Sequence, residues 1–120
     1  MKRLKYKKKI LVLSTNRSDY GLLKNLILEL KKNKDFLVEF VVSGSHLIQN
    51  YGNTINEIKK DKLQVFKKIK INYFSDTPSG VGKFNLDISK KFNGLLERNK
   101  FDILIVLGDR TETLFCSTLA

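Results

Sequence analysis

The chain has 120 residues, enough for one domain, with 42% hydrophobic and 29% charged residues, a balance typical of a soluble globular protein. No apolar run approaches the roughly 18 residues that a membrane span needs, and the run Ile10–Leu13 is too short for a signal peptide. The net charge is +11, and the single cysteine, Cys116, excludes an internal disulfide. We therefore expect a cytoplasmic protein in which Cys116 is a small buried hydrophobic residue.

The predicted elements alternate between strands and helices, as read from apolar runs and from apolar residues at helical spacing. In chain order we expect a strand at Lys9–Leu13, a helix at Tyr20–Lys32, a strand at Leu37–Val42, a short helix at Thr54–Lys60, a strand at Gln64–Ile71, a helix at Phe84–Asn99, a strand at Asp102–Leu107 and a helix from Thr111. The lysines of the third strand indicate an edge position. The apolar run of the fourth strand indicates a buried one.

The helix patterns also predict which side chains face the core. In the first helix the expected apolar stripe is Leu22, Leu23, Leu26, Ile27 and Leu30, with Ser18 or Asp19 accepting the free amides of its first turn. In the long helix the expected inward residues are Phe84, Ile88, Phe92, Leu95 and Leu96. The preceding segment, Asp76–Gly82, has the composition of a loop.

Strands separated by helices predict parallel pairing through right-handed crossovers, and hence an α/β, Rossmann-like domain with helices on both faces of the sheet. We expect this domain over residues 9–120, after a solvated basic arm at residues 1–8. Because the chain stops on apolar residues inside its last helix, we expect it to be the front portion of a longer protein.

Polar segments follow the strands at the edge where open α/β sheets place ligands. After the first strand, Arg17 precedes a helix whose N-terminus favours a phosphate, but the G-x-G-x-x-G pattern of dinucleotide sites is absent. After the second strand comes His46, the only histidine. After the fourth strand come Asp109 and Arg110, a possible acid–base group and a phosphate ligand. Spacing alone leaves a capped helix, an ordinary loop histidine and a structural ion pair as alternatives.

Four of these motifs together resemble a known family. The motifs Asn16–Tyr20 (NRSDY), Gly44–Leu47 (GSHL), Tyr51–Thr54 (YGNT) and Gly108–Arg110 (GDR) are similar in order and spacing to those of the hydrolysing UDP-N-acetylglucosamine 2-epimerases of sialic acid and related nonulosonic acid synthesis. The resemblance covers nearly the whole chain after the basic arm.

The resemblance implies the N-terminal half of a two-domain, glycosyltransferase-B-like fold with its site in the cleft between domains. It implies elimination of UDP from UDP-N-acetylglucosamine, hydration of the resulting glycal to N-acetylmannosamine, a homo-oligomeric full-length protein, and no cofactor or metal. Asp109 would be a catalytic carboxylate, and Arg17 and Arg110 would bind the diphosphate. The other substrate-binding positions it implies are Ser18, Gly21, His46 and Glu112.

The branch of the family can also be argued from the sequence. Non-hydrolysing relatives carry a G-T-R-P-E-A-x-K loop, whereas Leu22 occupies the lysine position here and neither Pro nor Glu follows Arg17. Their G-D-T segment is replaced by Gly108–Arg110. Both differences favour the hydrolysing branch, acting on UDP-N-acetylglucosamine or on a diacetamido-trideoxy sugar of legionaminic acid synthesis.

Two other classes of function remain open on the sequence. One is a non-catalytic nucleotide-binding module, because a further catalytic carboxylate and the second domain of the family lie beyond Ala120. The other is a nucleic-acid-binding protein, suggested by the charge of +11. The scattered lysines and the lack of a nucleic-acid-binding motif argue against the latter, and the length and sequence argue against a membrane partner.

Overall fold

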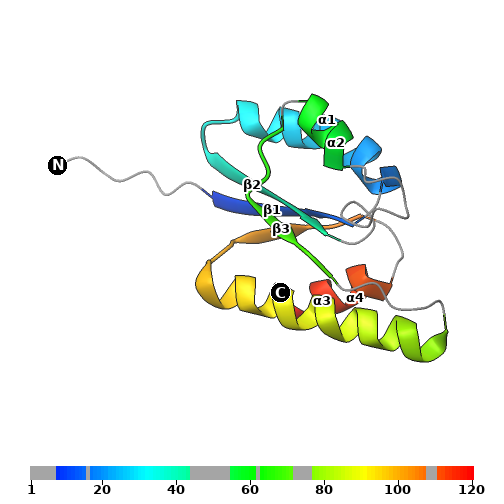
Figure 1. Cartoon of the computed structure of the whole chain (residues 1–120). Helices are drawn as coiled ribbons and strands as arrows, with labels where there is room; N and C mark the ends of the chain where they lie inside the picture. The colour runs from blue at the N-terminus through cyan, green and yellow to red at the C-terminus, as the bar shows by residue number, and fades with distance from the viewer. Residues whose placement is uncertain (1–7, 16, 44–54, 62, 72–76, 108–110) are drawn as a thin grey trace.

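The computed structural model describes residues 8–15, 17–43, 55–61, 63–71, 77–107 and 111–120. They form a parallel sheet in the order β3-β2-β1-β4, made of β1 (Lys8–Ser14), β2 (Phe36–Ser43), β3 (Lys67–Ile69) and β4 (Ile103–Ile105). Helices α1 (Arg17–Lys32) and α2 (Ile55–Lys60) cover one face, and α3 (Pro78–Arg98) and α4 (Thr111–Leu119) cover the other (Figure 1). The predicted α/β class, the parallel pairing and the helices on both faces are confirmed.

Strand β1 divides the hydrophobic core into two clusters. Its residues alternate between the faces of the sheet, as strand geometry requires. Ile10 and Val12 pack with the helices α1 and α2, whereas Leu11 and Leu13 pack with α3 and α4, and all four side chains are buried. Neither cluster therefore forms without β1. Cys116 is fully buried in the second cluster, as predicted.

The two outer strands are shorter than predicted. Strand β3 covers only Lys67–Ile69 and lies at the edge, as its lysines indicated. Strand β4 covers only Ile103–Ile105, and the prediction that its run is fully buried is wrong: Ile103 is 43% exposed and the next four residues are half-buried. The reason is position, because β4 is paired with β1 on one side and lies at the other edge of the described sheet.

Helix α1 begins at Arg17, so Ser18 and Asp19 lie inside its first turn rather than at the predicted capping position. The predicted apolar stripe was also too wide. Leu23 and Ile27 are buried, but Leu22 is 70% exposed and Leu26 is 41% exposed. The buried stripe begins instead with Tyr20, whose ring stacks on Phe40 of β2 at a centroid distance of 6.1 Å. This aromatic contact sets the rotation of α1 against the sheet.

Helix α3 begins at Pro78, six residues before the predicted start, so the prediction of a loop through Gly82 is wrong. Thr77 caps the helix: its hydroxyl accepts a hydrogen bond from the Gly80 amide at 3.1 Å, and Pro78 occupies the first turn. Three of the predicted inward residues, Ile88, Phe92 and Leu95, are buried, and Phe84 and Leu96 are half-buried. None of the helices in the described ranges is long and apolar enough to cross a membrane.

We expect Thr77→Ala to lower the free energy of unfolding by about 1 kcal/mol, because it removes the acceptor for an otherwise unpaired amide of the first turn. Ser79→Ala, two positions along the same helix, is the matched control and should change the stability by less than about 0.5 kcal/mol. Urea denaturation followed by circular dichroism measures both. Equal effects of the two substitutions would contradict the assigned cap.

Candidate functional site

The carboxyl ends of the strands meet at one edge of the sheet, which is where the sequence placed its candidate site. Strand β1 lies between β2 and β4, and the chain leaves β1 toward β2 but returns to β4 on the opposite side. The strand order therefore reverses between β1 and β4. In open α/β sheets the crevice outside such a reversal binds the ligand.

Two helices begin beside this reversal. Helix α1 starts at Arg17, just after β1 ends at Ser14, and α4 starts at Thr111, after β4. They lie on opposite faces of the sheet, so their N-terminal ends flank the crevice from both sides (Figure 1). Free amides and the helix dipole at such ends favour an anion. The arrangement therefore suits a phosphate-bearing ligand.

Buried polar side chains gather near this edge. They share positions at or next to the strand ends and in the first turns of the helices, and they are Ser14, Thr15, Asp19, Ser43 and Thr113. The Ser43 hydroxyl donates a hydrogen bond of 2.8 Å to the carbonyl oxygen of Ile69, which ties the end of β2 to the end of β3. The edge is therefore anchored by hydrogen bonds as well as by apolar packing.

The structure describes the predicted site residues unevenly. Arg17 and Glu112 are placed as residues of the first turns of α1 and α4. Ser18 and Gly21 are exposed on α1, and a Cβ on Gly21 would meet no heavy atom within 4 Å. His46, Asp109 and Arg110 lie outside the described residues. The helix positions of Arg17 and Glu112 are thus brought to the same edge, while the roles of all seven residues stay predictions.

A polar network that the sequence did not indicate joins α1 to the end of α2. The Tyr20 hydroxyl donates a hydrogen bond of 2.6 Å to Asp61, and the other oxygen of that carboxylate forms an ion pair with Lys24 at 2.9 Å. Tyr20 and Asp61 are 41 residues apart, so no local pattern could have revealed this contact.

This network shifts the ionisation of both partners. Burial, together with the hydrogen bond to Asp61 and its negative charge, raises the pKa of Tyr20 well above its ordinary value. The hydrogen bond from Tyr20, followed by that from Lys24, lowers the pKa of Asp61. At neutral pH the pair is therefore a neutral donor and a charged acceptor, which is the stronger kind of hydrogen bond. It fixes α2, which the chain enters from the segment carrying His46, against α1.

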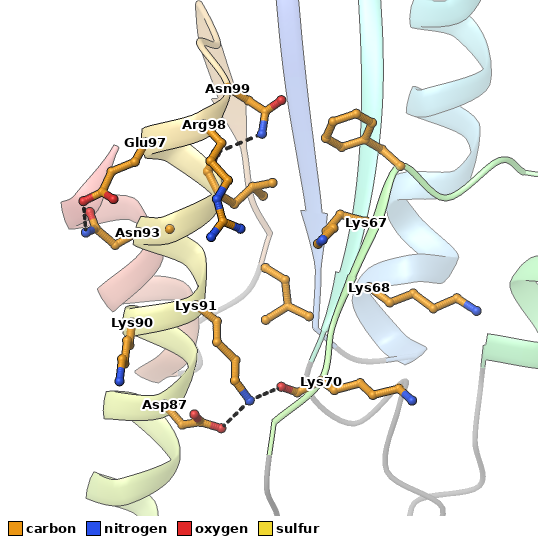
Figure 2. Close-up of a pocket in the computed structure, with 14 residues that line it drawn as sticks. Lys67, Lys68, Lys70, Asp87, Lys90, Lys91, Asn93, Glu97, Arg98 and Asn99 are labelled. Atoms are coloured by element: carbon orange, nitrogen blue, oxygen red, sulfur yellow. Dashed lines mark hydrogen bonds and ion pairs between the residues drawn. The ribbon is translucent and has the colours of Figure 1, made fainter.

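A second hollow lies away from this edge, in a groove of about 870 Å³ between β3 and α3. Figure 2 shows Lys91 reaching from α3 to both Asp87 and the carbonyl oxygen of Lys70. The other charged residues lining the groove are Lys67, Lys68, Lys90, Glu97 and Arg98. Lysines on an edge strand hinder pairing with another chain, so their presence is explained by protection of this edge.

The described residues offer no metal centre. Within the described ranges, no group of three or more His, Cys, Asp or Glu side chains is placed to hold a metal ion. The one network of charged and hydroxyl groups at α1 is satisfied by Tyr20, Lys24 and Asp61 among themselves.

Comparison with known proteins decides the family. The family profile of UDP-N-acetylglucosamine 2-epimerase matches residues 28–120. The chain belongs to the UDP-N-acetylglucosamine 2-epimerase family. Among curated relatives, it is 31% identical over 113 residues to the UDP-N,N'-diacetylbacillosamine 2-epimerase (hydrolyzing) of Legionella pneumophila, covering 94% of this chain and 30% of that protein. It is 33% identical over 108 residues to the GDP/UDP-N,N'-diacetylbacillosamine 2-epimerase (hydrolyzing) of Campylobacter jejuni, covering 90% and 28%.

Solved structures of this epimerase family share the fold. A crystal structure of a UDP-N-acetylglucosamine 2-epimerase superposes with a TM-score of 0.77 at 21% identity, over 94% of this chain and 30% of that one. The enzyme from Neisseria meningitidis, bound to UDP-GlcNAc, gives a TM-score of 0.75 at 20% identity, over 92% and 28%. The chain thus spans about 30% of the length of the curated relatives that it matches.

The Tyr20–Asp61 contact makes a prediction about acid stability. The folded-state pKa of Asp61 lies below its ordinary value of 3.8, so its stabilisation is complete above that value and is lost as the pH falls through the folded-state pKa. Tyr20→Phe should therefore destabilise the chain at pH 7 but much less near pH 3, and Asp61→Asn should reduce the effect of Tyr20→Phe at pH 7.

The control is Glu29→Gln, which removes an exposed ion pair with Lys32 of the same 2.9 Å length. We expect no measurable change from it at either pH, because exposed pairs contribute little. Urea denaturation of the single and double variants at both pH values provides the measurement. A Tyr20→Phe effect that is independent of pH and of Asp61 would contradict the network.

Proposed function

We propose that the chain is the N-terminal portion of a hydrolysing UDP-N-acetylglucosamine 2-epimerase, which converts UDP-N-acetylglucosamine and water into N-acetylmannosamine and UDP. The observation that carries the proposal is the reversal of strand order between β1 and β4 in a chain of this family. The segments that leave these two neighbouring strands are those that contain Arg17 and Asp109. One sheet edge therefore receives a cation for a diphosphate and a carboxylate for proton transfer.

The proposed reaction has two steps. In the elimination, a base removes the proton at C2 while the C1–O bond breaks, so the electron pair of the C–H bond forms the C1–C2 double bond and UDP leaves. In the hydration, water adds its oxygen to C1 and a proton reaches C2 from the opposite face, which gives N-acetylmannosamine. An acid–base group must lie near C2, and cations must stabilise the departing diphosphate.

Residues of this chain are assigned to these tasks. Asp109 is the carboxylate for proton transfer, and Arg17 and Arg110 bind the diphosphate, because a guanidinium binds phosphate oxygens through paired hydrogen bonds. The N-terminal amides of α1 and α4 add further donors. Ser18, Gly21, His46 and Glu112 are proposed to contact the rest of the substrate. The remaining machinery is assigned to the polypeptide beyond this chain.

The hydrolysing branch is supported by two independent features. The Legionella and Campylobacter relatives carry the word hydrolyzing in their names. In this chain Leu22 is exposed on α1 at the position where the non-hydrolysing loop has a lysine. Both relatives are named for a diacetamido-trideoxy sugar nucleotide, so that substrate is the second one to assay. By its composition and family we place the protein in the cytoplasm as a homo-oligomer when full-length.

A second candidate function follows from the share of the family that the chain spans, about 30% of each relative. A chain that holds the anion-binding edge without the rest of the enzyme would bind UDP weakly and catalyse nothing. This reading shares the diphosphate site with the first but not the turnover. Assays of binding and of catalysis therefore separate the two.

We expect this chain to bind UDP, and Arg17→Ala and Arg110→Ala each to raise the dissociation constant by about ten- to a hundredfold, since each removes a charge-assisted hydrogen bond to the diphosphate. Isothermal titration calorimetry measures the binding. Lys90→Ala, which removes one positive charge from the exposed side of α3, is the matched control and should leave UDP affinity unchanged.

The same series tests a nucleic-acid-binding role. RNA binding that weakens with salt, survives Arg17→Ala and Arg110→Ala, and disappears when residues 1–8 are removed would replace the nucleotide site by the basic arm as the functional feature. Affinity for UDP that is equal in all three variants would contradict the assignment of the two arginines.

For catalysis, we expect no UDP release from UDP-N-acetylglucosamine by the 120-residue chain above a no-enzyme control. In the full-length protein, Asp109→Asn should abolish turnover but largely spare UDP binding, because it removes the acid–base group and leaves the diphosphate contacts. A coupled assay of UDP and N-acetylmannosamine reports both. Near-normal turnover of the Asp109→Asn enzyme would contradict the catalytic role.

A further inference from the structure

The two edges of the sheet differ in a way that separates a finished edge from an unfinished one. Strand β3 carries Lys67 and Lys68, and Lys91 of α3 binds the carbonyl oxygen of Lys70 just beyond it. Strand β4 has no charged residue. Charges protect an edge strand from pairing with another strand, so β3 is built as an edge and β4 is not.

The free side of β4 can be assigned from its hydrogen bonds. The Asp102 amide donates to the carbonyl oxygen of Lys9 at 2.8 Å, so the peptide groups of this residue face β1. Because peptide groups alternate along a strand, those of Ile103 and Ile105 face away from β1. They are thus oriented to pair with a further parallel strand.

Helix α4 has the composition of a helix that is covered on two sides. Thr113 and Cys116 are buried against the rest of the domain, yet Leu114 is 61% exposed, and Phe115 and Leu119 are also exposed. Glu112 is the only charged residue of the helix. A helix that is apolar on both sides is typically enclosed between two layers.

The handedness of the crossovers locates the missing neighbour. Helices α1 and α2 cover one face while the chain moves from β1 to β3, and α3 and α4 cover the other face after the direction reverses (Figure 1). Crossovers between parallel strands are almost always right-handed. With α4 on the same face as α3, a right-handed crossover from β4 leads outward, to a strand on the free side of β4.

We propose that the edge of β4 and the exposed apolar side of α4 form the docking surface for the next strand–helix unit of the same polypeptide in the longer protein. This inference rests on the proposed N-terminal position of the chain, which covers about 30% of its relatives. The added strand pairs with Ile103 and Ile105, and the added helix covers Leu114 and Phe115. The occupant is therefore a continuation of this domain and not a second copy of the chain.

The test adds the missing part in trans. The probe is the portion of the Legionella pneumophila relative that follows the region matched to this chain, and association is measured by analytical ultracentrifugation. We expect a one-to-one complex, with the Ile103 and Ile105 amides exchanging hydrogen rapidly in the free chain and slowly in the complex. Ile103→Lys and Leu114→Lys should each weaken the complex by about tenfold or more, because a charge replaces apolar area that is buried on docking.

The matched control is Leu22→Lys, since Leu22 is 70% exposed on the opposite face of the sheet. It should leave association unchanged, and thermal unfolding checks that each variant is folded. Three results would overturn the proposal: no complex, a complex indifferent to Ile103→Lys and Leu114→Lys, or self-association of the chain through this surface without binding of the probe. None of these depends on UDP binding or turnover, so the docking surface and the proposed function fail separately.

Discussion

Burial of β1 on both faces is the constraint on which the rest of the structure depends. Because its side chains alternate, one strand supplies the floor of two separate hydrophobic clusters, and each cluster needs its own pair of helices. Helices on both faces in turn require the chain to reverse direction once across the sheet. That reversal places the carboxyl ends of β1 and β4 side by side, with α1 and α4 beginning on opposite faces. The crevice for a ligand is thus a consequence of how the core is covered.

Contacts distant in sequence then hold the crevice in shape. The Ser43 hydroxyl ties the ends of β2 and β3 together, and Asp61 receives the Tyr20 hydroxyl from the first turns of α1. The second contact matters for the site because α1 begins at the crevice and α2 follows the segment that carries His46. A shift of α2 would move both elements relative to each other. A polar pair, rather than apolar packing, sets this relation, since its short hydrogen bond tolerates little displacement.

Much of the fold could be predicted from spacing alone, and the errors have physical reasons. The order of elements and the inward residues Ile88, Phe92 and Leu95 follow from period and composition. The start of α3 was missed because its glycines indicate a loop, although Thr77 followed by Pro78 is a capping pattern that predicts the helix. The exposure of Leu22 follows from the stacking of Tyr20 on Phe40, a tertiary contact that helical spacing does not contain. The edge of the sheet that holds the candidate site was predictable, whereas the roles of its side chains remain predictions.

The error at β4 carries more information than the successes. Its residues have the composition of a strand buried from both sides, yet Ile103 is 43% exposed at an edge without charges. A sequence records the environment of the assembled protein, so a strand that is too apolar for its position indicates a neighbour that is not in view. Helix α4 supports the same interpretation, because Leu114 and Phe115 are exposed beside a buried Cys116. Since β4 and α4 enclose the segment with Asp109, the neighbour that covers them would also complete one wall of the candidate site.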